Sequence, residues 1–346
     1  MEAKVTTPGG GEFLLEETIP QEVFIPEEFT EEQCFLAKTV DDFMETEIWP
    51  RRAEIEAMAP GVAVGLLRRM GKLGFLAADI PEEFGGLGLD IVTSALIAEH
   101  VVGLGSFSAT FGGHTGIGTL PLLYLGTEEQ KRRYLPALAT GEKIGAYALT
   151  EPGAGSDALA SKTRATLSPD GKFWLLSGTK QFITNAGFAG LFTTYAKVDG
   201  EKFTAFLVDR DTPGLSLGPE EKKMGMRGSS TRALILEEAR VPVENLLGEI
   251  GRGHIVALNV LNMGRFKLAA SCMGNAKVAL ARATKYAQER VQFGKPIAEF
   301  GLIQEKLARI AAGIYAAESM VYRTAGLIAA RLAGAERGAG RETARA

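Results

Sequence analysis

The sequence is poor in the residues that build disulfide frameworks and metal sites. Its two cysteines, Cys34 and Cys272, lie far apart outside any C-x-x-C pattern, and its three histidines are scattered. Neither a disulfide-stapled fold nor a metal site is therefore indicated. No apolar run approaches the roughly 18 residues of a membrane-spanning helix, and the N-terminus lacks the basic-then-apolar pattern of a signal peptide. These features predict a cytoplasmic protein.

Positive charge is not in excess either. The chain has 38 lysines and arginines against 42 acidic residues, and no basic run is interleaved with aromatic residues. We therefore expect no binding to nucleic acid. A hydrophobic content of 46% in 346 residues is typical of a globular protein with two or three domains. A free coenzyme or an acyl thioester suits this composition better than a polyanion does.

The spacing of apolar residues divides the chain into four parts. Residues 1–27 are rich in Gly, Pro and Glu, and we interpret them as a tail that docks on a surface. Residues 28–143 have mainly helical periodicity, 144–252 form a small β domain, and 253–346 are helical again. This order predicts an α+β fold.

Within the first helical part, Thr30 is suited to cap a helix and a further helix is expected at 91–103. Two glycine-rich stretches, 80–90 and 111–119, are expected to interrupt the helices. Loops of this kind line a ligand cleft or mark tight helix packing, and the sequence leaves both open.

The β domain shows short runs rich in β-branched and aromatic residues, separated by Gly, Pro, Asp and Asn. Their connections are too short for helical crossovers, which favours antiparallel pairing. The predicted strands lie within residues 173–187, 191–198, 203–209 and 232–241.

Two long helices are predicted over 255–289 and 302–332, followed by a Gly-rich turn and the start of another helix in 334–346. Both helices carry more apolar surface than a two-helix hairpin can bury. We therefore expect further helices from a longer chain, from another subunit, or from both.

The stretch "YALTEPGAGSD", residues 147–157, follows a β-type run with a proline and two glycines. Closely spaced glycines suit a phosphate-binding loop, and Ser156 is a conceivable nucleophile. However, the chain contains no G-x-G-x-x-G or G-x-x-x-x-G-K-[ST], and Ser156 lacks the G-x-S-x-G frame. On its local sequence this stretch is best interpreted as an ordinary turn.

Six motifs taken together resemble those of the acyl-CoA dehydrogenase family, in its order and spacing over nearly the whole chain. The stretches 261–274 and 300–310 are most similar to the very-long-chain branch of that family. The resemblance implies a helical domain, a middle antiparallel β domain and a C-terminal helical bundle that is incomplete here. The motifs are "IPEEFGGLG" (80–88), "YALTEPGAGSD" (147–157), "KQFITNAG" (180–187), "KKMGMRGSSTRAL" (222–234), "VPVENLLGEIGRG" (241–253) and "ERVQFGKPI" (289–297).

The resemblance also implies that the chain binds FAD. In the family, the segment matched by residues 147–157 bends around the flavin, and the segment matched by 182–184 lies on the other face of the ring. A segment like 290–293 reaches across a dimer interface to the FAD of the neighbouring subunit. The residues implied to bind the cofactor are Tyr147, Leu149, Thr150, Gly155, Ser156, Phe182, Ile183, Thr184, Arg290, Gln292 and Phe293.

The implied reaction is α,β-dehydrogenation of a long-chain fatty acyl-CoA to trans-2-enoyl-CoA. The substrate would be held by Ser156 and by Asn262, Met263, Gly264 and Arg265, with Arg265 the direct contact. In most branches the catalytic glutamate lies beyond the position of residue 346; in others it occupies the position of Gly264. We therefore assign no catalytic residue in this chain. Glu151 and Glu305 match structural positions of the family.

The resemblance implies an electron-transferring flavoprotein as acceptor and a homodimer or homotetramer, and leaves membrane association open. Two alternatives share the scaffold: another flavoenzyme, such as an acyl-CoA oxidase or a flavin monooxygenase, and a non-catalytic protein that binds acyl-CoA or FAD. The second is favoured if residues 1–346 are the whole natural product.

Overall fold

The computed structural model describes residues 15, 17 and 19–338, which fall into two compact units. The helical unit comprises the described part of Met1–Asp41, Asp90–His100 and the described part of Ala269–Ala346. The mixed unit comprises Asp42–Leu89 and Val101–Leu268. Each is described by itself.

The mixed unit begins with the helices that the sequence predicts up to about residue 140. The last of them starts at a capping box, in which Thr127 Oγ1 accepts the Gln130 N–H and the Gln130 side chain accepts the Thr127 N–H. The helices of this unit are α2 (Arg52–Glu56), α3 (Val62–Lys72), α5 (Gly105–Gly112), α6 (Leu120–Leu125) and α7 (Glu128–Ala139).

The expected interruption at 80–90 is present, with a short 3₁₀ turn at Glu82–Phe84. The interruption expected at 111–119 is wrong, because Gly113–Gly118 continues α5 as a π-helical turn. Here the glycines permit close packing, since a Cβ on Gly118 would lie 2.6 Å from the carbonyl carbon of Gly145. Tight packing therefore explains the glycine at position 118.

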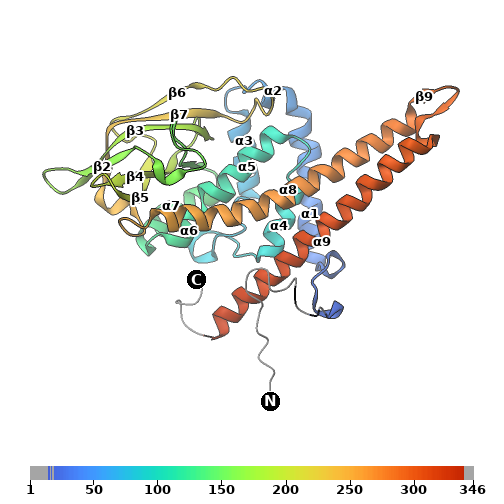
Figure 1. The fold of residues 1–346 in the computed structure, drawn as a ribbon, viewed down its shortest axis with the longest axis horizontal. Coiled ribbons are helices and arrows are strands. Elements are labelled where there is room, and N and C mark those ends of the chain that lie inside the picture. Colours follow the sequence, from blue (N-terminus) through green and yellow to red (C-terminus); the bar gives the residue numbers. More distant parts are fainter. Residues whose placement is uncertain (1–14, 16, 18, 339–346) are drawn as a thin grey trace, which may run out of the picture. The chain divides into compact units, whose positions relative to one another are not determined.

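The mixed unit also contains an eight-stranded sheet (Figure 1) and residues 253–268 at the N-terminal end of α8 (Gly253–Glu289). The four predicted strands correspond to β3, β4, β5 and β7. The other four strands are short or partly exposed, so their apolar residues give a weaker strand pattern in the sequence. The strands are β1 (Gly145–Ala148), β2 (Arg164–Leu167), β3 (Phe173–Thr184), β4 (Leu191–Val198), β5 (Lys202–Asp209), β6 (Leu215–Glu220), β7 (Thr231–Pro242) and β8 (Leu246–Leu247).

Most neighbours in this sheet are antiparallel, as predicted, but β4 also has two parallel partners. β1 pairs with residues 191–194 of β4, and β2 pairs with residues 197 and 198. Between each of these strands and β4, the chain passes through other strands of the same sheet. The parallel pairing therefore does not need a crossover helix. The sheet is therefore mixed around β4.

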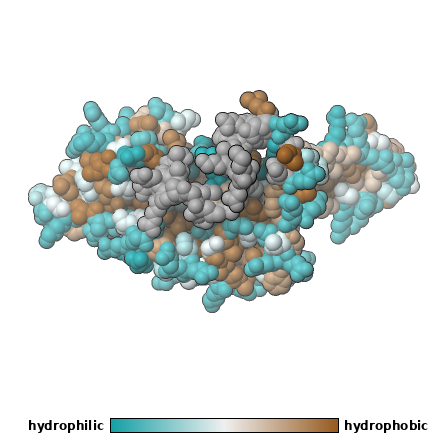
Figure 2. Space-filling model, turned by 90° about the horizontal axis from the view of Figure 1, so that it is seen from below, coloured by the Kyte–Doolittle hydropathy of each residue, from teal (hydrophilic) through white to brown (hydrophobic). Residues whose placement is uncertain are grey.

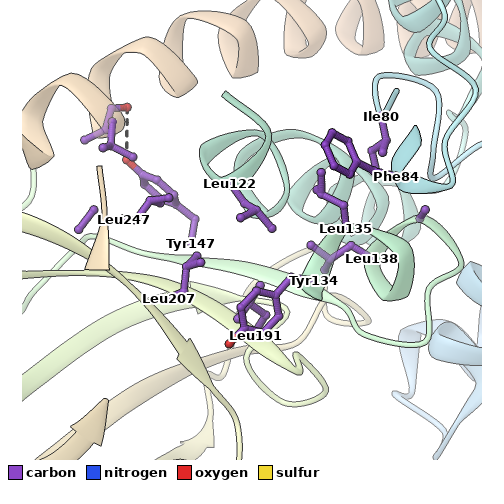
Figure 3. Packing of buried hydrophobic residues seen from close by; sticks show 14 of the residues in the cluster. Ile80, Phe84, Leu122, Tyr134, Leu135, Leu138, Tyr147, Leu191, Leu207 and Leu247 are labelled. Carbon is purple, nitrogen blue, oxygen red and sulfur yellow. Dashed lines mark hydrogen bonds between the residues drawn. The ribbon is translucent and has the colours of Figure 1, made fainter. Parts of the chain in front are cut away.

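Two hydrophobic clusters lie on opposite faces of the sheet because side chains alternate along each strand. In β4, Leu191 and Tyr195 belong to one cluster, and Phe192 and Ala196 to the other. Figure 3 shows the first cluster, in which the side chain of Tyr147 points toward α8. Full burial of a side chain such as Phe192 stabilises the fold by about 2 kcal/mol.

The helical unit is built from α1 (Glu31–Phe43, to Asp41), α4 (Ile91–His100), the C-terminal part of α8 (Gly253–Glu289) and α9 (Gly301–Gly338). α8 and α9 form a long hairpin with β9 (Val291–Gln292) and β10 (Lys295–Pro296) at its tip (Figure 1).

The ends of two helices in this unit differ from the prediction. The helix expected over 91–103 ends at His100. α9 runs to Gly338, through the expected turn, and the rest of the helix predicted after it lies outside the described residues.

Residues 15, 17 and 19–27 of the predicted tail are among the described residues. The tail contains 3₁₀ turns at Pro20–Glu22 and Pro26–Glu28, and residues 1–14, 16 and 18 lie outside the description. A Cβ on Gly326 of α9 would lie 2.5 Å from the Cβ of Phe24, and the Phe29 ring packs edge-on against Tyr322 at 4.8 Å. The tail therefore docks on α9 of the same chain.

Much of the α8–α9 surface is uncovered. Among the small residues of α8, Ala270 is buried whereas Ala269, Cys272, Ala279 and Ala283 are exposed. Figure 2 shows hydrophobic and hydrophilic residues mixed on the hairpin at the right of the view. Among the residues that the structure describes, no helix has an apolar stretch long enough to span a membrane.

Candidate flavin and thioester site

The stretch 147–157 leaves β1 and turns back on itself. The N–H groups of Glu151 and Ala154 each donate to the other residue's carbonyl oxygen, at 3.0 and 3.1 Å. The Glu151 side chain points inward and accepts hydrogen bonds from the N–H groups of Lys162 (2.6 Å) and Thr163 (3.1 Å). The chain thus bends around a buried carboxylate, while Gly155 and Ser156 stay exposed.

A second predicted segment lies directly beside this turn. The Gln181 N–H donates to the Thr150 carbonyl at 2.8 Å, and Lys180 Nζ lies 2.7 Å from Glu151 Oε1. The structure therefore brings Thr150 next to the start of the segment with Phe182, Ile183 and Thr184.

Phe182 stands out from β3 because the strand has a bulge there. Two residues, Gln181 and Phe182, face the single residue Ala233 of β7 between the pairs Lys180–Leu234 and Ile183–Arg232. Phe182 has a φ of +59° and is 56% exposed, whereas Ile183 turns into the core. The bulge thus presents an aromatic ring on the surface at the cost of backbone strain.

The side chains of Tyr147 and Leu149 make contacts within the protein. The Tyr147 hydroxyl donates to the carbonyl of Ala257 in α8 at 3.3 Å, and burial raises its pKa. Leu149 packs against the same hydrophobic cluster. The backbone of Tyr147 remains available for the predicted contact with the cofactor.

The residues predicted to hold the thioester lie on the part of α8 that belongs to the mixed unit. Asn262 and Arg265 are exposed, and Arg265 Nη1 donates to Asn262 Oδ1 at 2.8 Å. Gly264 is close to the π-helical turn Gly113–Gly118, since a Cβ there would lie 3.1 Å from Cγ2 of Ile117.

The sequence analysis missed an ion pair on this helix. Lys267 is buried, and its Nζ lies 2.5 Å from Asp79 Oδ2. Asp79 comes just before the "IPEEFGGLG" motif, so the pair fixes α8 two residues after Arg265. The available signal was a lysine between the apolar residues Phe266 and Leu268.

Arg290, Gln292 and Phe293 lie at the tip of the hairpin in the helical unit, and all three are exposed. Phe293 is 93% exposed with a φ of +52°. Their role toward FAD stays a prediction.

Neither carboxylate that the sequence analysis weighed is placed as a catalytic base. Burial raises the pKa of Glu151, but Lys180 and the N–H donors outweigh it and hold the pKa below its usual range. Glu151 is thus a fixed anion. Glu305 lies on the exposed surface of α9, 3.5 Å from Arg309.

These residues fit a bound flavin. A planar ring system needs an apolar or aromatic wall and polar groups at its edge. The exposed Phe182 ring supplies the first, and Thr150, Thr184 and the backbone of Gly155 can supply the second. Open space lies where a Cβ on Gly153 or Gly155 would be, so the backbone of this turn is accessible.

Three family models match consecutive parts of the chain. They describe the acyl-CoA dehydrogenase N-terminal domain (residues 30–142), middle domain (146–239) and C-terminal domain (251–341).

Similar proteins agree with these models. A probable acyl-CoA dehydrogenase of Bacillus subtilis is 54% identical over 92% of this chain and 54% of its own length. The human mitochondrial very long-chain specific acyl-CoA dehydrogenase is 39% identical over 90% of this chain and 49% of its own. The chain thus spans about half the length of these curated relatives.

A crystal structure of an acyl-CoA dehydrogenase complexed with FAD from Bacillus anthracis superimposes with a TM-score of 0.94 at 53% identity. The match covers 98% of this chain and 58% of that one. With models that match most of its length, the chain belongs to the acyl-CoA dehydrogenase family.

Proposed function

We propose that this chain forms the flavin-binding and thioester-binding part of an FAD-dependent acyl-CoA dehydrogenase. The observation that carries the proposal is the pairing of the two predicted flavin segments, with the Gln181 N–H on the Thr150 carbonyl and the Phe182 ring exposed beside them. The family membership and the similarity to an FAD complex support it.

In this proposal, Phe182 forms a wall for the flavin ring, and Thr150, Thr184 and the backbone of residues 147–156 bind its edge. When bound, FAD accepts the hydride that leaves the β-carbon of the thioester. Arg290 suits a pyrophosphate because its planar guanidinium can bind two oxygens, and with Gln292 and Phe293 it would reach the FAD of a neighbouring subunit.

The substrate would be a long-chain fatty acyl-CoA, and the product a trans-2-enoyl-CoA. Asn262 and Arg265 lie exposed on α8 and can hold the polar part of the thioester. A carboxylate must remove the α proton. We propose that this carboxylate follows residue 346 in the whole protein. Glu151 is paired with Lys180 in the interior, and Glu305 lies on the exposed surface of α9.

Several finer features rest on the family resemblance. We propose a homodimer or homotetramer, an electron-transferring flavoprotein as acceptor, a role in fatty acid β-oxidation, and a cytoplasmic location. The specificity for long chains belongs to the same proposal.

One alternative has an observation in its favour. Neither Glu151 nor Glu305 is placed to act as a base. This favours a protein that, as residues 1–346 alone, binds FAD and acyl-CoA without catalysing the reaction.

The purified 346-residue chain, stripped of flavin, tests the proposal. We expect FAD titrated into it to bind, with a change in its visible absorbance, and palmitoyl-CoA to shift that spectrum further. Riboflavin, which lacks the pyrophosphate and adenosine, serves as a control ligand and should bind more weakly. A chain that is folded by circular dichroism yet leaves the FAD spectrum unchanged would contradict the proposal.

A further inference from the structure

The pair Glu151–Lys180 is the most deeply buried ion pair among the described residues. The side chain of Lys180 is 0% exposed and that of Glu151 is 5% exposed. Lys180 Nζ also lies 3.4 Å from the Leu149 carbonyl, while Glu151 accepts the two N–H groups of Lys162 and Thr163. Both charges are therefore fully engaged.

The pair joins the two segments assigned to the flavin. Glu151 directly follows Thr150, and Lys180 lies two residues before Phe182. A single backbone hydrogen bond, from the Gln181 N–H to the Thr150 carbonyl, connects the segments between these positions. The bulge at Gln181 and Phe182 weakens the strand pairing on the other side. The ion pair is thus the side-chain link that lies nearest to both Thr150 and Phe182 and adds to the backbone hydrogen bond in fixing their separation.

Stability alone does not explain such a pair. Desolvation of two buried charges roughly offsets their attraction, and apolar replacements of both partners are often neutral in stability. We propose that Glu151 and Lys180 are positioning residues that hold the two flavin-facing segments at the separation that binds the flavin ring. This inference rests on the proposed function.

The decisive variant replaces both partners, Glu151→Gln with Lys180→Met, so that no unpaired charge is left in the interior. The carbonyl oxygen of the new amide side chain can still accept a hydrogen bond from the Lys162 or Thr163 N–H. We expect this variant to unfold at nearly the same urea concentration as the unchanged chain, to bind FAD at least tenfold more weakly, and to give a different visible circular dichroism of the bound flavin. The dichroism reports ring placement directly.

A matched control removes a second ion pair of the same unit, with Lys143→Met and Asp209→Asn. Lys143 Nζ lies 2.5 Å from Asp209 Oδ1, and the pair joins the turn between α7 and β1 to the end of β5 without touching either flavin segment. We expect its FAD dissociation constant to stay within twofold of the unchanged chain.

The outcomes separate the two levels of the proposal. If the unchanged chain binds FAD and the Glu151→Gln/Lys180→Met variant binds it within twofold with the same dichroism, the positioning role is wrong and the proposed function stands. A double variant that fails to fold would also overturn this role, because the pair would then stabilise the fold as a whole. If the unchanged chain does not bind FAD, both proposals fail.

Discussion

His114 is a buried side chain whose hydrogen bonds determine its tautomer. Nδ1 lies 3.0 Å from the N–H of Gly145, so Nδ1 accepts and Nε2 carries the proton, which it donates to the Leu138 carbonyl at 3.0 Å. Burial, slightly opposed by the bond to Leu138, lowers the pKa of His114 to about 4. The neutral ring thus joins the π-helical turn both to α7 and to the start of β1.

This residue predicts an acid-sensitive fold. The unfolded chain takes up the proton near pH 6.5, and the folded chain only near 4, so stability falls as the pH falls through this window. At pH 5 the loss relative to pH 7 is about 2 kcal/mol. Urea unfolding at the two pH values, for the unchanged chain and for His114→Gln, measures it. An equal loss in both proteins would contradict the assignment.

Phe182 combines backbone strain with an exposed ring, which suggests that its conformation serves binding. We expect Phe182→Gly to leave the free energy of unfolding within about 1 kcal/mol, because glycine adopts positive φ without strain. FAD binding should weaken about tenfold through loss of the ring contact. Glu238→Gly, at φ +51° elsewhere in the sheet, is the control and should bind FAD normally. Equal FAD affinity in both variants would exclude the ring contact.

At the scale of elements, α8 and α4 approach closely at one glycine. A Cβ on Gly274 would lie 1.9 Å from the carbonyl oxygen of Glu99, which is backbone and cannot move aside easily. Nearby, Lys277 bonds both Glu99 and Glu318, and the Tyr322 hydroxyl donates to Glu99. The close contact lets one polar network tie α4, α8 and α9 together.

We therefore expect Gly274→Ala to destabilise the helical unit by about 2 to 3 kcal/mol, because the helices must separate. Gly313→Ala on α9 is the matched control: no atom lies within 4 Å of its added Cβ, and alanine favours the helix by up to about 1 kcal/mol. Thermal unfolding followed by circular dichroism at 222 nm compares the two. If Gly274→Ala melted no lower than Gly313→Ala, the close approach would be wrong.

At the scale of the whole molecule, the proposed position of the catalytic base leads to a prediction for the reaction with substrate. The chain spans about half of its first curated relatives, and its hairpin exposes Leu302, Tyr315 and Met320. We expect anaerobic addition of palmitoyl-CoA to shift the spectrum of FAD bound to residues 1–346 without bleaching it. A longer chain that carries the proposed base should bleach the flavin. Bleaching by the short chain would place the base within it.

The sequence by itself determined the elements with strong periodicity. The strand predicted at 191–198 matches β4 residue for residue, because both of its faces are apolar and its ends are marked by glycine. The two long helices and the family motifs could also be identified from the sequence, since both depend on residues close together in the chain.

Tertiary structure alone decided what depends on distant partners. Glu151 and Lys180 lie 29 positions apart and Asp79 and Lys267 lie 188 apart, so no local pattern marks either pair. The parallel pairing of β4 with β1 likewise depends on a distant strand, because β2 pairs only with residues 197 and 198 of β4 and leaves residues 191–194 for β1. The glycine at position 118 in the π-helical turn is likewise decided by a distant partner, because β1 approaches it so closely that a Cβ there would lie 2.6 Å from the carbonyl carbon of Gly145.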